Sequence, residues 1–271
     1  MRALVLFLAA SHLLAQQRVV SLAPSATEML YALGWGDRIV GVTKYCHYPP
    51  EARKKTQVGD YLKPSLEAIA ALKPDLLIGD PSTTQVNLSG VRFAAIERQN
   101  LAAIERSIVA IAKAMGDPSR ATPLVSRMRQ ELEKVRQRNQ GRPKRKAMFV
   151  VGRNPGQLSG LVVVGRDSFL NELISLAGGE NIFATANISY LQISTEEILA
   201  RQPDVIIDMG DMADTDGVAP GHLAAVRTLY SKLPQVNAVK QGRIFAVASD
   251  IYVVPGPRVV DAAREFEKMF R

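Results

Sequence analysis

The chain of 271 residues contains a single cysteine, Cys46. One cysteine excludes an intramolecular disulfide and the paired-cysteine motifs of zinc and redox sites. Histidine is also scarce, with only His12, His47 and His222. The patterns GxSxG, HExxH, Walker A and GxGxxG are missing, which argues against the common hydrolase, metalloprotease and nucleotide-binding sites.

Long apolar runs are absent except at the N-terminus. Arg2 precedes an apolar run over residues 3–10, and the small residue Ala15 follows. This pattern is typical of a secretory signal peptide, so we expect residues 1–16 to be removed on export; the alternative is a buried first strand or helix. No cysteine follows the run, so the sequence gives no sign of a lipid anchor. We expect a soluble mature chain in the periplasm, monomeric and not inserted in the membrane.

The charge is unbalanced towards the basic side, with a formal net charge of +8. The one dense basic cluster is RPKRK at 142–146, which lacks interleaved aromatic residues. Nucleic-acid modules combine a basic face with a recognisable motif, and none is present. We therefore interpret the cluster as a solvated surface and expect no nucleic-acid partner.

Strand and helix patterns alternate along the rest of the chain. Ser25 is expected to cap a helix over 26–33 with Glu28 in its first turn. Strands are expected at 18–22, 38–42, 75–79, 91–97, 147–151, 204–207 and 243–247, and further helices at 65–72, 101–115, 221–232 and 259–270. Such alternation with short connections predicts an α/β fold with parallel sheets covered on both faces.

A long charged helix is predicted over residues 123–139. Its apolar residues, Leu124, Met128, Leu132 and Val135, form one narrow stripe, as in a mostly solvated helix. We expect it to connect two Rossmann-like lobes, with an N-terminal lobe over 17–119, a connecting segment over 120–143 and a C-terminal lobe over 144–271. The segment 81–90 is too short to hold the crossover helix that normally joins two parallel strands.

A repeated phrase supports the two-lobe division. SLEAIAALKPDLLIG at 65–79 aligns without gaps to STEEILARQPDVIID at 194–208, with seven identities in fifteen positions. In each copy a serine is placed to cap a helix, a proline ends it and an apolar strand follows. Glu67 and Glu196 occupy the same first-turn position, where a carboxylate stabilises a helix. Glu197 fits the capping-box position after Ser194.

Two parallel sheets facing each other would place their strand-end loops around a cleft. Five of the seven tyrosines fall on these loops, namely Tyr45, Tyr48, Tyr61, Tyr190 and Tyr252. Aromatic rings suit a large flat ligand, although each tyrosine alone fits ordinary packing. An alternative is a metal-dependent enzyme that uses His47 with the acidic loop 208–216. That loop lacks the EF-hand spacing, so we do not expect a metal site, a cofactor or catalytic residues.

Several motifs resemble one known family. They are RVVSLAPSATEMLYALG, VGV-x-x-Y-x-x-YPP, QVG-x-Y-x-x-PSLEAIAALKPDLLI, AGGENIF and SD…PGPR, spread over residues 18–270. They are similar to class III periplasmic substrate-binding proteins of ABC importers, and closest to the vitamin B12-binding members. The resemblance implies two α/β lobes, a ligand held between them, and docking onto a permease dimer with its ATPase.

The resemblance also implies roles for individual residues. Tyr45, Tyr61, Tyr190 and Asp250 are expected to contact the ligand, and Tyr252 is included with them because it lies on a strand-end loop. Tyr61 and Tyr190 replace tryptophans of the vitamin B12 binders. Asp80 and Gln157 stand where those relatives carry Trp and Phe, and we include both in the expected pocket.

The resemblance further assigns the paired glutamates. Glu67 and Glu196 match the pair that contacts arginines on the two permease subunits. The implied function is capture of a corrinoid for an ABC importer, with ferric-siderophore or haem binding as the alternative.

Overall fold

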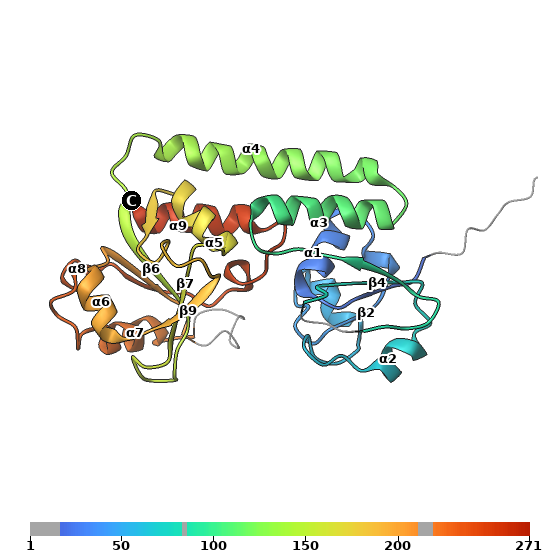
Figure 1. The fold of residues 1–271 in the computed structure, drawn as a ribbon, viewed down its shortest axis with the longest axis horizontal. Helices are drawn as coiled ribbons and strands as arrows, with labels where there is room; N and C mark the ends of the chain where they lie inside the picture. Colours follow the sequence, from blue (N-terminus) through green and yellow to red (C-terminus); the bar gives the residue numbers. More distant parts are fainter. Residues whose placement is uncertain (1–16, 83–85, 211–218) are drawn as a thin grey trace, which may run out of the picture.

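The computed structural model describes residues 17–82, 86–210 and 219–271. The expected signal peptide, residues 1–16, lies outside the described residues. The chain forms two α/β lobes side by side, bridged along one edge by the helix α4 (Figure 1). Among the described residues, no helix has the length and apolar character needed to cross a membrane.

The first lobe is built on a fully parallel sheet with strand order β3-β2-β1-β4-β5. Its strands are β1 (Val19–Ser21), β2 (Ile39–Val42), β3 (Thr56–Gln57), β4 (Leu76–Gly79) and β5 (Arg92–Ala95), and its helices are α1 (Pro24–Ala32), α2 (Leu66–Ala71) and α3 (Leu101–Ala114). The short helices η1 (Gly36–Arg38), η2 (Pro50–Lys54) and η3 (Pro118–Arg120) fill connections. The described residues between β4 and β5 contain no helix, which agrees with the prediction that this segment is too short for one.

The second lobe has strand order β11-β10-β6-β7-β9, with β8 also paired to β6. Its strands are β6 (Arg145–Gly152), β7 (Leu161–Val164), β8 (Gly179–Asn181), β9 (Tyr190–Ile193), β10 (Val205–Asp208) and β11 (Ile244–Ala246). Its helices are α5 (Phe169–Leu176), α6 (Thr195–Arg201), α7 (His222–Tyr230), α8 (Asn237–Lys240), η4 (Asp250–Tyr252) and α9 (Val259–Phe270).

One strand departs from the expected parallel pattern. Strand β7 runs antiparallel to both β6 and β9, so the second sheet is mixed. Only residues 153–160 separate β6 from β7, and a connection of that length forms a hairpin rather than a crossover.

Helix α4 (Ala121–Asn139) lies within the connecting segment expected from the sequence. Its nineteen residues extend about 28 Å at 1.5 Å per residue. The stripe Leu124, Met128, Leu132 and Val135 is buried, because α4 packs on α3 at one end and on α9 and α5 at the other (Figure 1). A single rigid helix therefore contacts both lobes.

The repeated phrase forms a capped helix followed by a strand in both lobes. Ser65 accepts a hydrogen bond from the Ala68 N–H at 3.1 Å, and Ser194 forms a capping box with Glu197. Lys73 (φ 45°) and Gln202 (φ 48°), each followed by proline, are the only non-glycine residues with positive φ in the described chain. They are equivalent in the two copies, so the similarity extends to an uncommon backbone conformation.

Helix α1 differs from its prediction at its start. It begins at Pro24 after Ala23, and Ser25 lies inside the helix without capping it. Proline suits the first helical position, because its fixed φ is helical and its missing N–H is not needed there. Glu28 is therefore not a solvated first-turn carboxylate; it is buried.

Candidate functional site

A cavity of about 450 Å³ lies between the two lobes. The first lobe contributes residues that follow the carboxyl ends of its strands, and the second contributes the segment after β11. The lining residues are Ala23, Pro24, Ser25, Tyr45, His47, Tyr61, Asp80, Ile96, Arg98, Asp250, Val253, Val254 and Pro255. This position agrees with the rule that ligands bind at strand carboxyl ends in α/β sheets.

Four of the expected ligand-contact residues line this cavity: Tyr45, Tyr61, Asp80 and Asp250. The side chain of Tyr45 is 44% exposed, and Lys44 lies over its ring at 4.8 Å. Asp60 pairs with Lys44 at 2.6 Å and accepts a hydrogen bond from the Tyr45 hydroxyl at 3.4 Å. These contacts hold an exposed aromatic ring at the cavity rim.

Tyr190, the fifth expected contact, lines a smaller neighbouring cavity of about 190 Å³. Arg98, Val253 and Pro255 line both cavities, so the two spaces adjoin. Tyr190 comes from β9 of the second lobe, whereas Tyr45 and Tyr61 come from the first. Aromatic side chains therefore reach the cleft from both lobes.

Three further residues named from the sequence line neither cleft cavity. Tyr252 is only 4% exposed and packs between Phe149 and Phe266, with ring centroids 5.8 and 5.4 Å away. It belongs to the hydrophobic core, because η4 turns it away from the cleft. Tyr48 lines a different cavity, where the guanidinium carbon of Arg258 lies 3.8 Å from the centroid of its ring. Gln157 lies exposed in the β6–β7 connection, where it accepts a hydrogen bond from Ser159, and lines neither cleft cavity.

A second group of residues joins the lobes beside the cleft. Arg258, at the start of α9, forms bidentate hydrogen bonds with Glu28 of α1, one of them 3.1 Å from Nε to Oε2. It also contacts both oxygens of Asp250, at 2.9 and 2.8 Å. A Cβ on Gly256 would lie 2.8 Å from Glu28 Oε2, so only glycine leaves room for this carboxylate.

The electrostatics of this network follow from its burial. Burial raises the pKa of Glu28 to about 7, although the hydrogen bonds from Arg258 act in the opposite direction. Burial acts to lower the pKa of Arg258, but Glu28 and Asp250 outweigh it and raise that pKa. Arg258 is therefore a permanent cation between two carboxylates. Sequence analysis missed this group, because its two halves are 230 residues apart.

Of the residues of the metal-enzyme alternative, His47 and Asp208 lie among the described residues, and they do not line the same cavity. Asp208 is fully buried, where it accepts hydrogen bonds from Arg153 at 2.9 Å and from the Tyr230 hydroxyl at 2.9 Å. His47 lines the cleft, which Asp208 does not, and the rest of that loop, residues 211–216, lies outside the described residues. Within the described chain, no group of three His, Cys, Asp or Glu side chains is placed to hold a metal.

Comparison with known proteins agrees with this geometry. The family model described as periplasmic binding protein matches residues 19–251. The chain belongs to the periplasmic binding protein family. Members of this family carry the two-lobed α/β architecture found here.

Individual members of the periplasmic binding protein family are similar over most of the chain. The vitamin B12-binding protein of Vibrio cholerae is 30% identical over 255 residues, covering 92% of this chain and 87% of that protein. The crystal structure of the periplasmic vitamin B12-binding protein of the same organism has a TM-score of 0.77 at 27% identity, covering 94% and 96% of the two chains. The apo structure of a periplasmic haem-binding protein from Roseiflexus sp. RS-1 has a TM-score of 0.75 at 28% identity, covering 94% and 100%.

Within this periplasmic binding protein fold, the paired glutamates lie at equivalent points of the two lobes. Glu67 is in the first turn of α2 and Glu196 in the first turn of α6, and both are exposed. A hydrogen bond with Ser194 lowers the pKa of Glu196, so it is charged at neutral pH. Each lobe thus presents one carboxylate to solvent at a helix N-terminus.

Proposed function

We propose that this protein is an extracytoplasmic solute-binding protein that captures a corrinoid and delivers it to an ABC importer. The observation that carries the proposal is the inter-lobe cavity of about 450 Å³ with Tyr45 and Tyr61 on its lining and Tyr190 beside it. Aromatic faces supply large contact area to a flat macrocycle at low conformational cost. The similarity to vitamin B12-binding proteins supports the same ligand class.

Ligand recognition would combine stacking with a few polar contacts. Asp250 lies on the cavity wall and is held by Arg258, so its carboxylate is oriented before a ligand arrives. An oriented polar group loses less entropy on binding than a mobile one. The amide N–H groups of the corrin would donate hydrogen bonds to this carboxylate. The proposal assigns binding and no catalysis to the cleft.

Delivery would use the exposed carboxylates at the two lobes. Glu67 and Glu196 would each pair with an arginine of one permease subunit, so that a two-lobed protein contacts a permease dimer and its ATPase. Equivalent helix N-termini in the two lobes support this pairing. Separating binding from docking requires the two glutamates to be changed together.

A haem or ferric-siderophore binder is the second candidate. The haem-binding relative from Roseiflexus has a similar identity and TM-score. His47, Tyr45 and Tyr61 on the cavity lining are side chains that also bind iron. This candidate predicts haem binding with a shifted Soret band and no measurable affinity for cobalamin.

Titration of the purified mature protein separates the candidates. Cyanocobalamin, haem and a ferric hydroxamate are added separately, and calorimetry together with intrinsic fluorescence reports binding. Micromolar or tighter binding of cyanocobalamin is expected. No heat and no quenching with cyanocobalamin, alongside binding of haem or the hydroxamate, would transfer the function to the second candidate.

A further inference from the structure

We propose that Arg98 forms an anion-binding subsite in the cleft, which takes a phosphodiester or carboxylate of the bound ligand. This inference rests on the proposed function and specifies the ligand chemistry. Arg98 follows β5 and belongs to none of the motifs recognised in the sequence.

Arg98 occupies the junction of the two cleft cavities and lines both of them. Its side chain is 46% exposed, so its guanidinium is accessible from the cleft. Burial raises the pKa of Tyr190, while Ser168 and the positive charge of Arg98 act against that increase. The charge of Arg98 therefore acts on the cleft tyrosine of the opposite lobe.

Asp80 fixes the orientation of Arg98. The carboxylate is 4% exposed, and its Oδ2 lies 2.8 Å from Nε of Arg98. Its Oδ1 accepts hydrogen bonds from the N–H and hydroxyl of Ser82, at 2.8 and 2.6 Å. Asp80 is thereby anchored at the end of β4 and holds the inner edge of the guanidinium.

The outer edge of the guanidinium is left for a ligand. Arginine carries five N–H donors in a planar fork, and Asp80 is the one ion-pair partner of Arg98 among the described residues. The ion pair with Asp80 is formed by Nε, and Arg98 lines both cleft cavities. A guanidinium of this kind can bind a phosphate or carboxylate in a bidentate manner through its Nη groups. Asp80 here serves to position Arg98 rather than to contact the ligand.

Two other carboxylates near the cleft have cations of their own. Glu97 pairs with Arg106 at 2.5 Å, and Asp250 pairs with Arg258. Asp167 lines only the smaller cavity. We therefore place the ligand anion on the side of Arg98 that faces the larger cavity, where no carboxylate without an ion pair lies among the described lining residues.

Two ligand classes carry the required anion. Cobalamin has a phosphodiester in its nucleotide loop, and cobinamide lacks that loop. Haem carries propionates, and haem dimethyl ester has them blocked. The second compound of each pair keeps the macrocycle and lacks the anion. Comparing the two compounds therefore isolates the contribution of Arg98 to binding the anion.

The experiment measures dissociation constants for both pairs with the full mature chain and with Arg98→Met. Arg136→Met is the matched control, because Arg136 is an exposed arginine on α4 paired with Glu133. A charged hydrogen-bond partner contributes roughly tenfold to hundredfold in affinity. We expect Arg98→Met to weaken cyanocobalamin by that factor and to leave cobinamide unchanged, or to do the same for haem against its dimethyl ester. Arg136→Met is expected to change neither.

The outcomes separate the subsite from the proposed function. Equal effects of Arg98→Met on both members of a pair, or no effect, would overturn the subsite while leaving the binding function intact. Binding of neither pair would overturn the proposed function. In that case, titration with inorganic phosphate decides on the subsite. A shift of the Arg98 guanidinium resonances, assigned with Arg98→Met, supports it, and the absence of a shift overturns it.

Discussion

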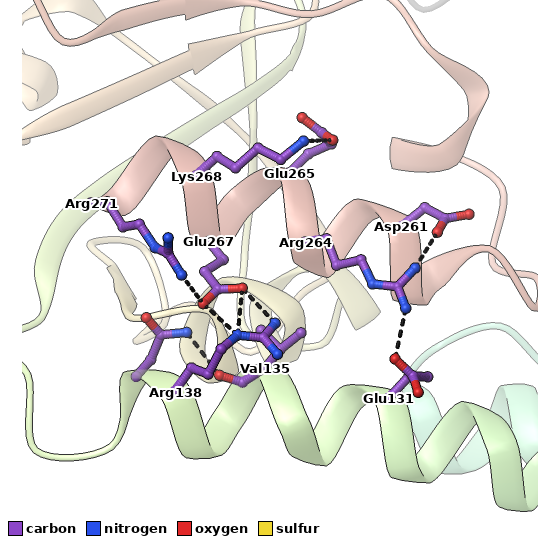
Figure 2. Close-up of polar contacts among 10 residues, drawn as sticks. Glu131, Val135, Arg138, Asp261, Arg264, Glu265, Glu267, Lys268 and Arg271 are labelled. Atoms are coloured by element: carbon purple, nitrogen blue, oxygen red, sulfur yellow. Dashed lines mark hydrogen bonds and ion pairs between the residues drawn. The ribbon is translucent and has the colours of Figure 1, made fainter.

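Arg138 on the connecting helix α4 holds Glu267 on the terminal helix α9 through bidentate hydrogen bonds. Nε lies 2.9 Å from Oε1 and Nη2 lies 2.7 Å from Oε2 (Figure 2). Arg271 adds a bond at 2.8 Å, and Glu267 is only 4% exposed. The connecting helix is thus fastened to the second lobe by a shielded ion pair.

Glu267→Gln is expected to destabilise the protein in a pH-dependent way. The hydrogen bond from Arg138 is the main reason that the pKa of Glu267 is lowered to about 2 from 4.5. The ion pair therefore stabilises fully above pH 4.5, and this stabilisation is lost as the pH falls towards 2. Urea unfolding should show a loss of about 1–3 kcal/mol at pH 7 and a smaller loss at pH 3. Glu265→Gln, at a glutamate of the same helix that is 39% exposed and pairs with Lys268, is the control and should change little. Equal losses at both pH values would contradict the prediction.

Arg258→Met is expected to lower the free energy of unfolding by more than the removal of a surface charge would. It leaves Glu28 and Asp250 beside each other without a cation, and removal of one partner of a buried pair costs about 3–5 kcal/mol. Adding Glu28→Gln should recover part of the loss, since one buried charge then disappears. Arg264→Met, an exposed arginine of the same helix paired with Glu131, is the control. Urea unfolding of the four proteins measures this, and a double variant less stable than Arg258→Met would refute it.

Glu28→Gln alone should alter the pH profile of stability. Burial raises the folded-state pKa of Glu28 to about 7, above the ordinary 4.5. The folded state then holds an extra proton between these values, so this contribution is present below pH 4.5 and is lost as the pH rises through 7. The difference in unfolding free energy between wild type and Glu28→Gln should change between pH 5 and pH 7.5. A constant difference would show that Glu28 stays ionised throughout.

Tyr61→Ala and Tyr252→Ala should separate ligand contact from core packing. Tyr61 lines the cavity, and loss of aromatic stacking should weaken cyanocobalamin binding about threefold to tenfold with little effect on stability. Tyr252 lies in the core, so its truncation should cost about 3–5 kcal/mol in unfolding free energy. Tyr252→Phe keeps the ring and should bind normally. Weaker binding by Tyr252→Phe would indicate that the Tyr252 hydroxyl contacts the ligand.

The double change Glu67→Ala with Glu196→Ala should abolish uptake and leave ligand binding intact. Neither side chain lines the cleft, so the dissociation constant should not change. Glu133→Ala, a glutamate on α4 whose side chain is 40% exposed and paired with Arg136, is the control for uptake. Transport at the wild-type rate by the double variant would show that both glutamates only stabilise their helix ends and do not take part in docking.

Much of the fold could be predicted from local patterns. The stripe of α4, the proline breaks after Lys73 and Gln202, and the caps at Ser65 and Ser194 depend on neighbours within a few residues, which a sequence displays directly. The prediction that Ser25 caps α1 was wrong for a reason that is also local. Serine and proline both mark helix starts, and here the helix begins at the proline. The antiparallel strand β7 escaped prediction, since strand direction depends on pairing rather than on composition.

By itself, the sequence determined the two repeated α/β units, the helix between them and the strand-end positions of the tyrosines, because periodicity and capping are local properties. Only the tertiary structure decided which of those tyrosines reach the cleft, since η4 turns Tyr252 into the core while Tyr61 stays on the lining. It also decided that Glu28, Asp250 and Arg258 meet, and that Asp80 orients Arg98. These contacts join residues far apart in the chain, so burial and charge pairing between them exist only in the folded molecule.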